Sequence, residues 1–453
     1  MSGLLLPRPL ARRRSAHLVA ILVTASLGAA IVPGQGGVRS LAVAAERGPV
    51  SLGPCVLPQA KKADRPATEL RVALARMLGE HAYLLMELMR AETGAAGEGE
   101  AAQATIDANT KSLSDAVASV YGADAGKAFR ALWDRHIVAA AAFARATAGG
   151  DTAGAEAARH ELHAFQSAFD AFLADANPKL DADAESAAVQ LHLKHVEQFA
   201  AGDFSAAYTS ARDAYGHMFD MGDMLARAIA KQFPKRFPDV RIAFSPASEL
   251  RVYLDRLLGE HLILAAEVMR AGMAQAPDFP AIRQALDANA ADLRDAIGGI
   301  YGKDAGAAFA EVWHAHLVAY LDYVDAVREN DPDRMATVRQ TLDAYGRVFG
   351  EFMASANPKL SADGVAELIA MHTASLVEMV DDYRAEDYAA ANATAAEAYV
   401  HMFEVGDALA AAIAAQLPSR FADLAELPAT DTGPSAGHAG LHPPRAAGWW
   451  RPR

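Results

Sequence analysis

Cysteine is nearly absent from this chain of 453 residues, since Cys55 is the only one. A single thiol cannot close an intramolecular disulfide, so packing alone must hold the fold together. It also excludes a zinc site built from several thiolates, a covalently attached c-type haem and a protein-ligated iron–sulfur cluster. Any metal site in this protein therefore has to rely on other ligands, such as histidine and methionine.

Basic residues are outnumbered by acidic ones. The chain carries 42 Lys and Arg against 56 Asp and Glu, which gives a net charge of −14. Because no basic stripe accompanies this balance, a nucleic-acid-binding surface is excluded. An acidic surface favours solubility and attracts cations.

Long apolar runs are missing except near the start of the chain. Leu18–Val32 is apolar but shorter than the ~20 residues that a spanning helix needs. Arg12–Arg14 precede it, and Ala42-Val43-Ala44 follow it as a small-residue cleavage site. Residues 1–45 are therefore predicted to be a signal peptide rather than a retained anchor. We expect an extracytoplasmic protein, secreted or associated with the cell envelope, with no transmembrane segment in the mature chain.

The chain does contain a long internal repeat. Arg76–Arg90 reads RMLGEHAYLLMELMR, and Arg256–Arg270 reads RLLGEHLILAAEVMR, 180 residues later (261 − 81 = 180). The last matched pair is 184 residues apart (401 − 217 = 184), so the second copy has gained about one helical turn before it. Further matched segments are 107–109 with 287–289, 121–126 with 301–306, 176–180 with 356–360, and 217–223 with 401–407.

Composition and periodicity predict an all-α fold for both copies. Apolar residues recur at steps of three and four, and Ala-rich segments favour helix. Short loops between long amphipathic helices indicate antiparallel neighbours, hence a bundle of roughly six helices in each copy. Gly122 is predicted to end the second helix of repeat 1, and Asp124 to cap the third. The helices of repeat 1 are expected near 68–92, 101–121, 124–147, 152–175, 181–201 and 203–232.

The repeat predicts two tandem bundle domains within a longer chain. A flexible lead-in rich in Pro, Gly and Lys is expected at 46–66, repeat 1 at 67–237, a linker at 238–247 and repeat 2 at 248–422. Residues 423–453 are rich in Gly and Pro and lack periodicity, so they are expected to form a disordered tail.

Histidines at matched positions are the candidate functional residues. Each copy carries four of them, on four different predicted helices and near apolar stripes. A buried imidazole without a partner costs about 1–3 kcal/mol, so each of them needs a hydrogen bond or a metal ion. The candidate metal ligands are His81, His136, His192 and His217 in repeat 1, and His261, His316, His372 and His401 in repeat 2.

Other polar residues carry less specific expectations. Asp223 and Asp407 could orient an imidazole, or they could be helix caps or surface acids. Arg90 and Arg270 are expected on solvated faces or in pairs between helices. The histidines with no counterpart in the other copy are expected at the surface, and these are His160, His163, His195 and His314.

Ligand type ranks the possible metals. Histidine with nearby methionine suits copper, particularly Cu(I), and Met221 lies one turn after His217. Non-covalent haem between facing histidines is the second option and zinc the third. A ferritin-type site is excluded, because Glu80 directly precedes His81 instead of standing three residues before it. No His-x-x-x-Glu or His-x-x-x-His occurs at the matched positions, which excludes a hemerythrin-like site.

The pattern GEH…MR, YGxDAGxAF, NPKL and HMFxxGD, present twice, resembles a group of secreted helical-repeat proteins of soil bacteria. The resemblance covers both repeats, about residues 67–422. Some members of that group carry the label copper amine oxidase. The Asn-Tyr-Asp/Glu tripeptide that bears the quinone of such oxidases does not occur here, and the helical composition conflicts with their β-rich catalytic domain. The resemblance therefore implies no oxidase activity.

Signatures of other enzymes are also missing. The chain has no nucleophile elbow, phosphate loop or Rossmann glycine fingerprint in a proper context. The sequence therefore favours an exported binding protein over an enzyme, with a transition metal, copper first, as its ligand. One alternative is a structural or interaction module of the cell envelope whose histidines belong to a metal-free core. A haem protein with redox activity is a third interpretation.

Overall fold

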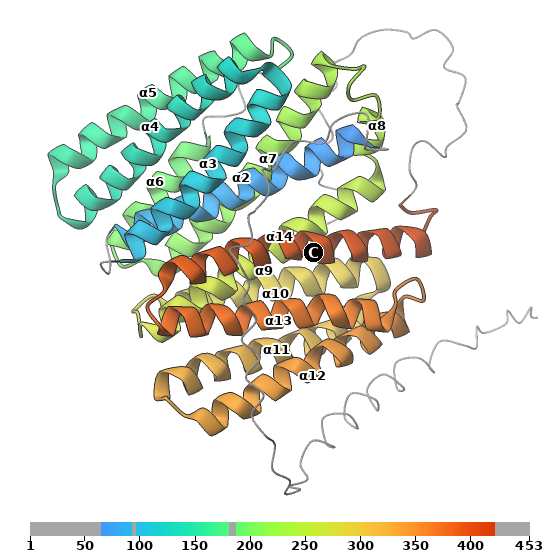
Figure 1. Ribbon diagram of the computed structural model, residues 1–453. Coiled ribbons are helices and arrows are strands. Elements are labelled where there is room, and N and C mark those ends of the chain that lie inside the picture. The colour runs from blue at the N-terminus through green and yellow to red at the C-terminus, as the bar shows by residue number, and fades with distance from the viewer. Residues whose placement is uncertain (1–64, 93–96, 181–186, 422–453) are drawn as a thin grey trace, which may run out of the picture.

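The computed structural model describes residues 65–92, 97–180 and 187–421 (Figure 1). Every regular element in these ranges is a helix, which confirms the all-α prediction. The predicted signal peptide at 1–45, most of the lead-in with Cys55, and the predicted tail at 423–453 lie outside the described residues.

Repeat 1 contains six long helices, and most of their ends fall within three residues of the predicted ones. Gly122 ends α3 with a φ of 97°, a conformation that glycine adopts at little cost. The predicted cap is wrong, because α4 begins at Ala123 and Asp124 lies inside its first turn without a capping bond. The predicted start of α6 at 181 falls outside the described residues. The six helices are α2 (Pro66–Ala91), α3 (Glu98–Tyr121), α4 (Ala123–Ala148), α5 (Thr152–Ala176), α6 (Ala187–Ala200) and α7 (Phe204–Gln232).

Repeat 2 reproduces this arrangement. Its first helix, α9, packs against α10, α11, α13 and α14, as α2 packs against α3, α4, α6 and α7. The first helix is therefore the central one in each copy, and it carries the GEH segment. The helices of repeat 2 are α9 (Pro246–Met273), α10 (Phe279–Tyr301), α11 (Lys303–Glu329), α12 (Pro332–Ala356), α13 (Ala362–Arg384) and α14 (Tyr388–Gln416).

The predicted linker is tied to repeat 1. It includes the short helix α8 (Val240–Ala243). The Asp239 carboxylate accepts hydrogen bonds from the backbone N–H groups of Ala67 (2.8 Å) and Thr68 (3.3 Å), which are free donors at the start of α2. The buried Arg71 donates to the carbonyl of Ala243 at 2.8 Å. The linker thus caps the central helix of repeat 1.

The two copies share a buried interface. Repeat 1 occupies the upper part of Figure 1 and repeat 2 the lower part, with α14 packed on α3 and α7 on α10. Val72, Tyr215 and Phe219 of repeat 1 belong to the hydrophobic core cluster of repeat 2. Glycine permits the closest approach, because a Cβ at Gly79 would lie 2.7 Å from Phe219 and from the Tyr399 hydroxyl. The copies are therefore two bundles, each with its own core cluster, joined through a buried interface.

Among the described helices, α14 is the one that is long and apolar enough to cross a membrane by length and composition. In the most apolar window of this helix, 56% of the residues are buried inside the fold. It packs against α9, α13 and α3. These contacts are those of a core helix.

Candidate metal centre

Three buried histidines of repeat 2 converge in its core. His261 on α9, His316 on α11 and His372 on α13 bring ligand nitrogens within 4.8 Å of one another. The Nε2 atoms of His261 and His316 are 3.4 Å apart. The ring centroid of His372 lies 5.4 Å from that of His261. Each residue is at most 1% exposed. Three of the four candidate ligands of this copy thus come together.

Helical spacing directs these imidazoles inward. On α13, His372 stands between Ile369 and Leu376 on the buried stripe, at steps of three and four residues. On α11, Trp313 precedes His316 by three residues and lies on the same face. The indole ring centroid lies 4.8 Å from the His261 ring and 4.6 Å from the His316 ring. Trp313 therefore packs against two of the three imidazoles and excludes water from them.

The polar atoms around this point are mostly without hydrogen-bond partners in the described part of the chain. Both ring nitrogens of His372 have none, nor do the Nδ1 atoms of His261 and His316, the Trp313 indole N–H or the Tyr345 hydroxyl. Buried polar groups in folded proteins are nearly always partnered, and each failure costs about 1–3 kcal/mol. A cation bound between the Nε2 atoms of His261 and His316 would also give a partner to one nitrogen of His372.

The three imidazoles are held in their neutral form. Burial lowers the pKa of His316 to about 3. Burial, and then the neighbouring histidines, hold the pKa values of His261 and His372 well below the ordinary range. Neutral imidazole is the form that ligates metals. The ligand group found among the described residues contains no carboxylate, so it is an uncharged three-nitrogen set.

Tyr345 is a residue of this site that the sequence analysis missed. Its ring packs against that of His316 with centroids 4.9 Å apart, and in repeat 1 Phe165 packs against His136 at 4.5 Å. The two positions correspond (345 − 180 = 165). Because phenylalanine provides the same packing in repeat 1, packing does not require the hydroxyl. A position-by-position comparison of the two copies would have revealed this difference.

His401, the fourth candidate ligand of repeat 2, lies apart from the other three. Its Nε2 is 2.8 Å from the carbonyl oxygen of Leu368 on α13, and its Nδ1 is 2.9 Å from the Glu404 carboxylate. The side chain is 12% exposed. His401 thus lies at the edge of the bundle, where α14 packs against α13.

Repeat 1 arranges its corresponding histidines differently. The Nε2 atoms of His81 and His136 are 3.0 Å apart, and the Trp133 indole N–H donates to His81 Nδ1 at 3.3 Å. With Nδ1 accepting, the neutral His81 ring carries its proton on Nε2 and directs it at His136. Both nitrogens of His81 are therefore used in hydrogen bonds. Burial lowers the pKa of His136 to about 3.

The other two candidates of repeat 1 lie near this pair. His192 is buried, and neither of its ring nitrogens has a partner among the described residues. Burial, and then the neighbouring His195 and His217, lower the pKa of His192 to about 3. The Nε2 of His217 is also buried without such a partner. In the described residues, repeat 2 alone brings three histidines close enough to share one ion.

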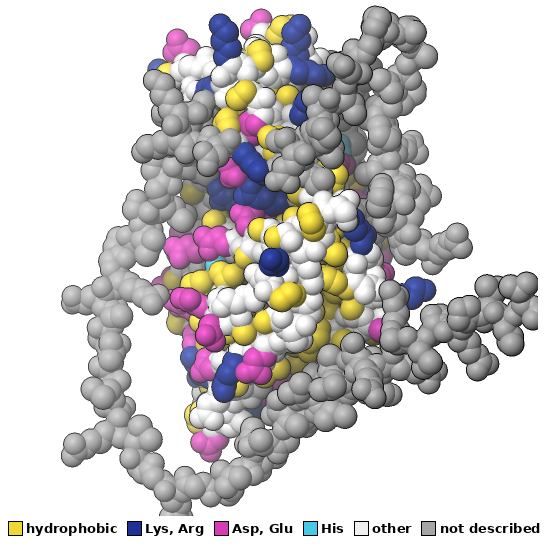
Figure 2. Space-filling view, turned by 90° about the vertical axis from the view of Figure 1, so that its right-hand side faces the viewer, with side chains coloured by type: hydrophobic (Ala, Val, Ile, Leu, Met, Phe, Trp, Pro, Cys, Tyr) yellow, Lys and Arg dark blue, Asp and Glu magenta, His cyan; other side chains and the backbone are white. Residues whose placement is uncertain are grey.

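One expectation about the unmatched histidines is wrong. His195 is buried, with Nδ1 2.9 Å from the carbonyl oxygen of Ala207, because it follows His192 by three residues on the inner face of α6. That spacing was the available signal. His160, His163 and His314 are exposed as expected. Figure 2 shows one face of the molecule, where acidic, basic and apolar side chains mix and histidine is visible only in small spots.

The matched aspartates bind arginines instead of orienting imidazoles. Asp223 accepts from Arg71 at 2.6 Å, and Asp407 accepts from Arg251. Each pair joins the first and last helices of its copy. The pairs continue across the two copies, because Arg71 also bonds Glu249 at 2.9 Å. These salt bridges stabilise the arrangement of the helices around the histidines.

Arg90 and Arg270 lie inside the boundary between the copies. Arg90 bonds Glu87 at 2.9 Å and Glu98 at 2.6 Å, and Arg270 bonds Glu267 at 3.0 Å. A cavity of about 30 Å³ is lined by both arginines. That volume suits a single water molecule, so this charged cluster joins the two copies and does not form a pocket for an organic ligand.

No family model, no curated protein and no solved structure matches this chain.

Proposed function

We propose that this is an exported protein that binds a transition metal ion, copper first, through His261, His316 and His372 of repeat 2. The observation that carries the proposal is the cluster of neutral, buried imidazoles, in which His372 has no hydrogen-bond partner in the described chain and His261 and His316 have only each other. The predicted signal peptide supplies the extracytoplasmic location.

The donor spacing supports a bound ion. Imidazole nitrogens bind metals at about 2.0–2.1 Å, which places two ligands of one ion about 3.3–3.6 Å apart in tetrahedral or trigonal geometry. The Nε2 atoms of His261 and His316 are 3.4 Å apart. His372 needs only a small rotation to close the set, since all the donor atoms already lie within 4.8 Å.

Charge favours the monovalent ion. The ligand set is uncharged, and the cost of burying an ion rises with the square of its charge. A Cu(I) ion therefore suits this site better than Zn²⁺ or Cu²⁺, for which a carboxylate would offset the charge. Haem fits less well, because the Trp313 and Tyr345 rings lie within 4.9 Å of the imidazoles, where the macrocycle would have to lie.

Repeat 1 is the weaker site in this proposal. His81 has to give up the Nε2 proton, and with it the Trp133 hydrogen bond, before that nitrogen can bind a metal. In repeat 2 no N–H of the described residues donates to the Nδ1 of His261, so this nitrogen can carry the ring proton and leave Nε2 to bind a metal. We therefore expect one tight equivalent in repeat 2 and one weaker equivalent in repeat 1.

Anaerobic titration with Cu(I) in the presence of a competing chelator, and a parallel titration with zinc, test the proposal. Wild type should bind one tight equivalent of Cu(I), and His372→Ala should lose it. His314→Ala removes an exposed histidine of the same repeat and should bind as wild type does. Circular dichroism checks that each variant is folded. If wild type does not bind Cu(I), the histidines belong to a metal-free core, and the protein is interpreted as a structural module instead.

A further inference from the structure

The three-histidine site needs an entrance. Its ligands are at most 1% exposed, so an ion has to pass other side chains before it reaches them. His401 lies between these ligands and solvent. The ring contacts the carbonyl of Leu368, and Leu368 and His372 are four residues apart on α13, which makes them neighbours on one face. His401 thus contacts α13 one turn before His372.

The bonding around His401 leaves a position for a cation. Both ring nitrogens face oxygen atoms, since Nε2 is 2.8 Å from the Leu368 carbonyl and Nδ1 is 2.9 Å from Glu404. A neutral imidazole has only one N–H. If Nε2 donates it to Leu368, Nδ1 keeps an electron pair, and if Nδ1 donates it to Glu404, Nε2 keeps one, so in either tautomer one ring nitrogen can bind a cation.

The two side chains of this pair lie close enough together to bind one ion. In the trigonal or tetrahedral geometry of Cu(I), two ligands of one ion lie about 3.3–3.6 Å apart, so a small rotation of either side chain opens the 2.9 Å hydrogen bond into a ligand pair. His401 and Glu404 are three residues apart on α14, so the helix itself sets this spacing. The Glu404 side chain is 63% exposed, so an ion can reach the pair directly from solvent.

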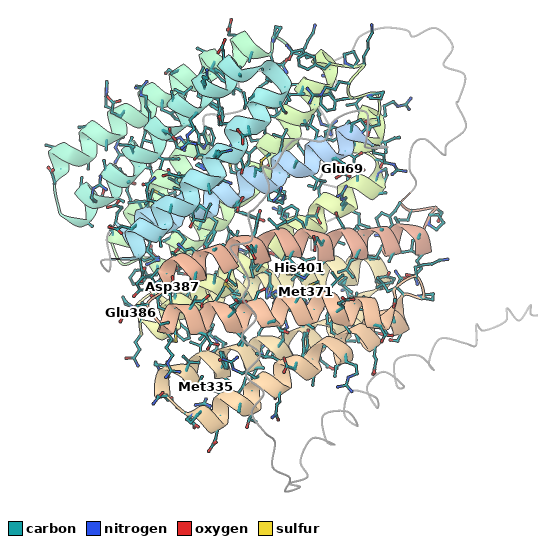
Figure 3. The ribbon with its side chains drawn as sticks, in the orientation of Figure 1. Glu69, Met335, Met371, Glu386, Asp387 and His401 are labelled. Carbon is teal, nitrogen blue, oxygen red and sulfur yellow. The ribbon has the colours of Figure 1, made fainter. Side chains whose placement is uncertain are left out.

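A third donor is close on the neighbouring helix. Met371 is 45% exposed, which is unusual for methionine, and it follows Leu368 by three residues on α13. Figure 3 shows Met371 and His401 close together on the adjacent helices α13 and α14. A thioether is a soft ligand that suits Cu(I). Repeat 1 carries leucine at the corresponding position (371 − 180 = 191), so packing alone does not require a sulfur.

The same inner and outer relationship occurs in both copies. The nearby His401 adds to the lowering of the pKa of His372, after burial and His316, and His217 does the same for His192. In each copy the fourth histidine is therefore an electrostatic neighbour of the third, on the solvent side of it. Two diverged copies have kept this arrangement.

We propose that His401 and Glu404, assisted by Met371, form an outer, exchangeable site that transfers Cu(I) to and from His372. This inference rests on the proposed function of the inner three histidines. A ligand on the route lowers the barrier between solvent and the inner site without taking part in the final complex. It therefore changes the loading and release rates by the same factor and leaves the equilibrium constant unchanged.

Stopped-flow transfer of Cu(I) to and from a coloured copper chelator, followed by absorbance on the full chain, measures both rates. For His401→Ala we expect both to fall on the order of tenfold, which corresponds to about 1.4 kcal/mol of barrier. His401→Gln keeps an N–H for Leu368 and guards against a folding defect, and it should be as slow. Glu404→Gln should be intermediate. His314→Ala is the control and should match wild type.

Two results would overturn the inference while leaving the inner site in place. Rates in His401→Ala and His401→Gln that equal those of wild type would remove His401 from the route. Loss of the tight equivalent in both variants would make His401 an inner ligand. Wild type that binds no Cu(I) would reject the inner site itself, and is thus a separate outcome.

Discussion

The hydroxyl of Tyr215 lies 3.1 Å from that of Tyr399, and the two residues are counterparts in the two copies (399 − 215 = 184). Equivalent residues meet in this way at an approximate two-fold axis, as in a symmetric dimer. The tyrosines lie over Gly79 and Gly259, which are counterparts as well (259 − 79 = 180). The duplicated domains thus associate through the same surface on each copy.

The first prediction tests this contact. Gly79→Ala places a Cβ 2.7 Å from Phe219 and from the Tyr399 hydroxyl, so it should destabilise the protein by about 1–3 kcal/mol. Gly99→Ala is the matched control, because nothing lies within 4 Å of a Cβ there. Alanine is the better helix former, so the control should be neutral or stabilising by up to about 1 kcal/mol. Urea unfolding measures both, and equal effects would place the steric role of Gly79 in doubt.

A second prediction concerns Asp255, a buried carboxyl group in the core of repeat 2. Neither of its oxygens has a hydrogen-bond partner among the described residues, and burial raises its pKa well above the ordinary value. The corresponding residue in repeat 1 is Ala75 (255 − 180 = 75). Asp255→Ala should therefore stabilise the protein by about 1–3 kcal/mol at neutral pH.

The sign of the pH dependence sharpens this test. A carboxyl group whose folded pKa is raised destabilises the fold increasingly as pH rises above about 4, because the unfolded chain releases its proton first. The gain from Asp255→Ala should therefore be larger at pH 8 than at pH 4. Ala75→Asp, which introduces the same group in repeat 1, should be destabilising. A gain that is the same at both pH values would contradict the argument.

The buried histidines predict a loss of stability in acid. His136, His192 and His316 have pKa values lowered to about 3, whereas in the unfolded chain the value is about 6.5. Below pH 6.5 the unfolded state binds protons that the folded state does not. The free energy of unfolding is therefore unaffected by these histidines above that pH and falls as the pH decreases toward 3. At pH 5 each histidine should cost about 2 kcal/mol.

Urea unfolding of the metal-free protein at pH 7.5, 6 and 5 checks this prediction. His316→Phe should reduce the loss between pH 7.5 and 5, since one titrating group is removed. His160→Ala, at an exposed position, should show the wild-type slope. If the His316→Phe variant kept that slope, the histidine would already be solvated in the folded protein.

Periodicity in the sequence predicts some features of the fold and of the metal site, but not others. A stripe at steps of three and four residues reports that His261, His316 and His372 face inward, and helix breakers such as Gly122 report where helices end. Periodicity does not report which helix lies opposite. For that reason the sequence analysis grouped His401 with the inner histidines. In the structure its neighbour Met402 is fully buried, whereas His401 lies at the edge of the bundle and is 12% exposed.

The buried interface between the two copies could not be predicted from periodicity for the same reason. Val72 and Tyr215 lie on stripes that predict burial equally well within one copy or between copies. The buried charges could not be predicted from the sequence for a different reason, which is that arginine is usually exposed. Arg71 is only 1% exposed, and it depends on Asp223 and Glu249 from two other helices that sequence spacing does not connect.

The last prediction concerns the weaker site. The Trp133 indole donates to His81 Nδ1 and so keeps the proton on the nitrogen that a metal would need. Trp133→Phe removes this bond but keeps an aromatic ring against Phe129, whose centroid lies 4.9 Å away. It should cost about 1 kcal/mol of stability in the metal-free protein and raise the Cu(I) affinity of repeat 1 by on the order of tenfold.

The affinity is measured in a His372→Ala background, where the tight site of repeat 2 is removed and the titration follows repeat 1 alone. Trp313→Phe is the matched control, because its indole N–H has no partner among the described residues, and it should leave the repeat 1 affinity unchanged. Weaker binding in the Trp133→Phe variant would mean that the indole orients His81 for the metal instead of blocking it.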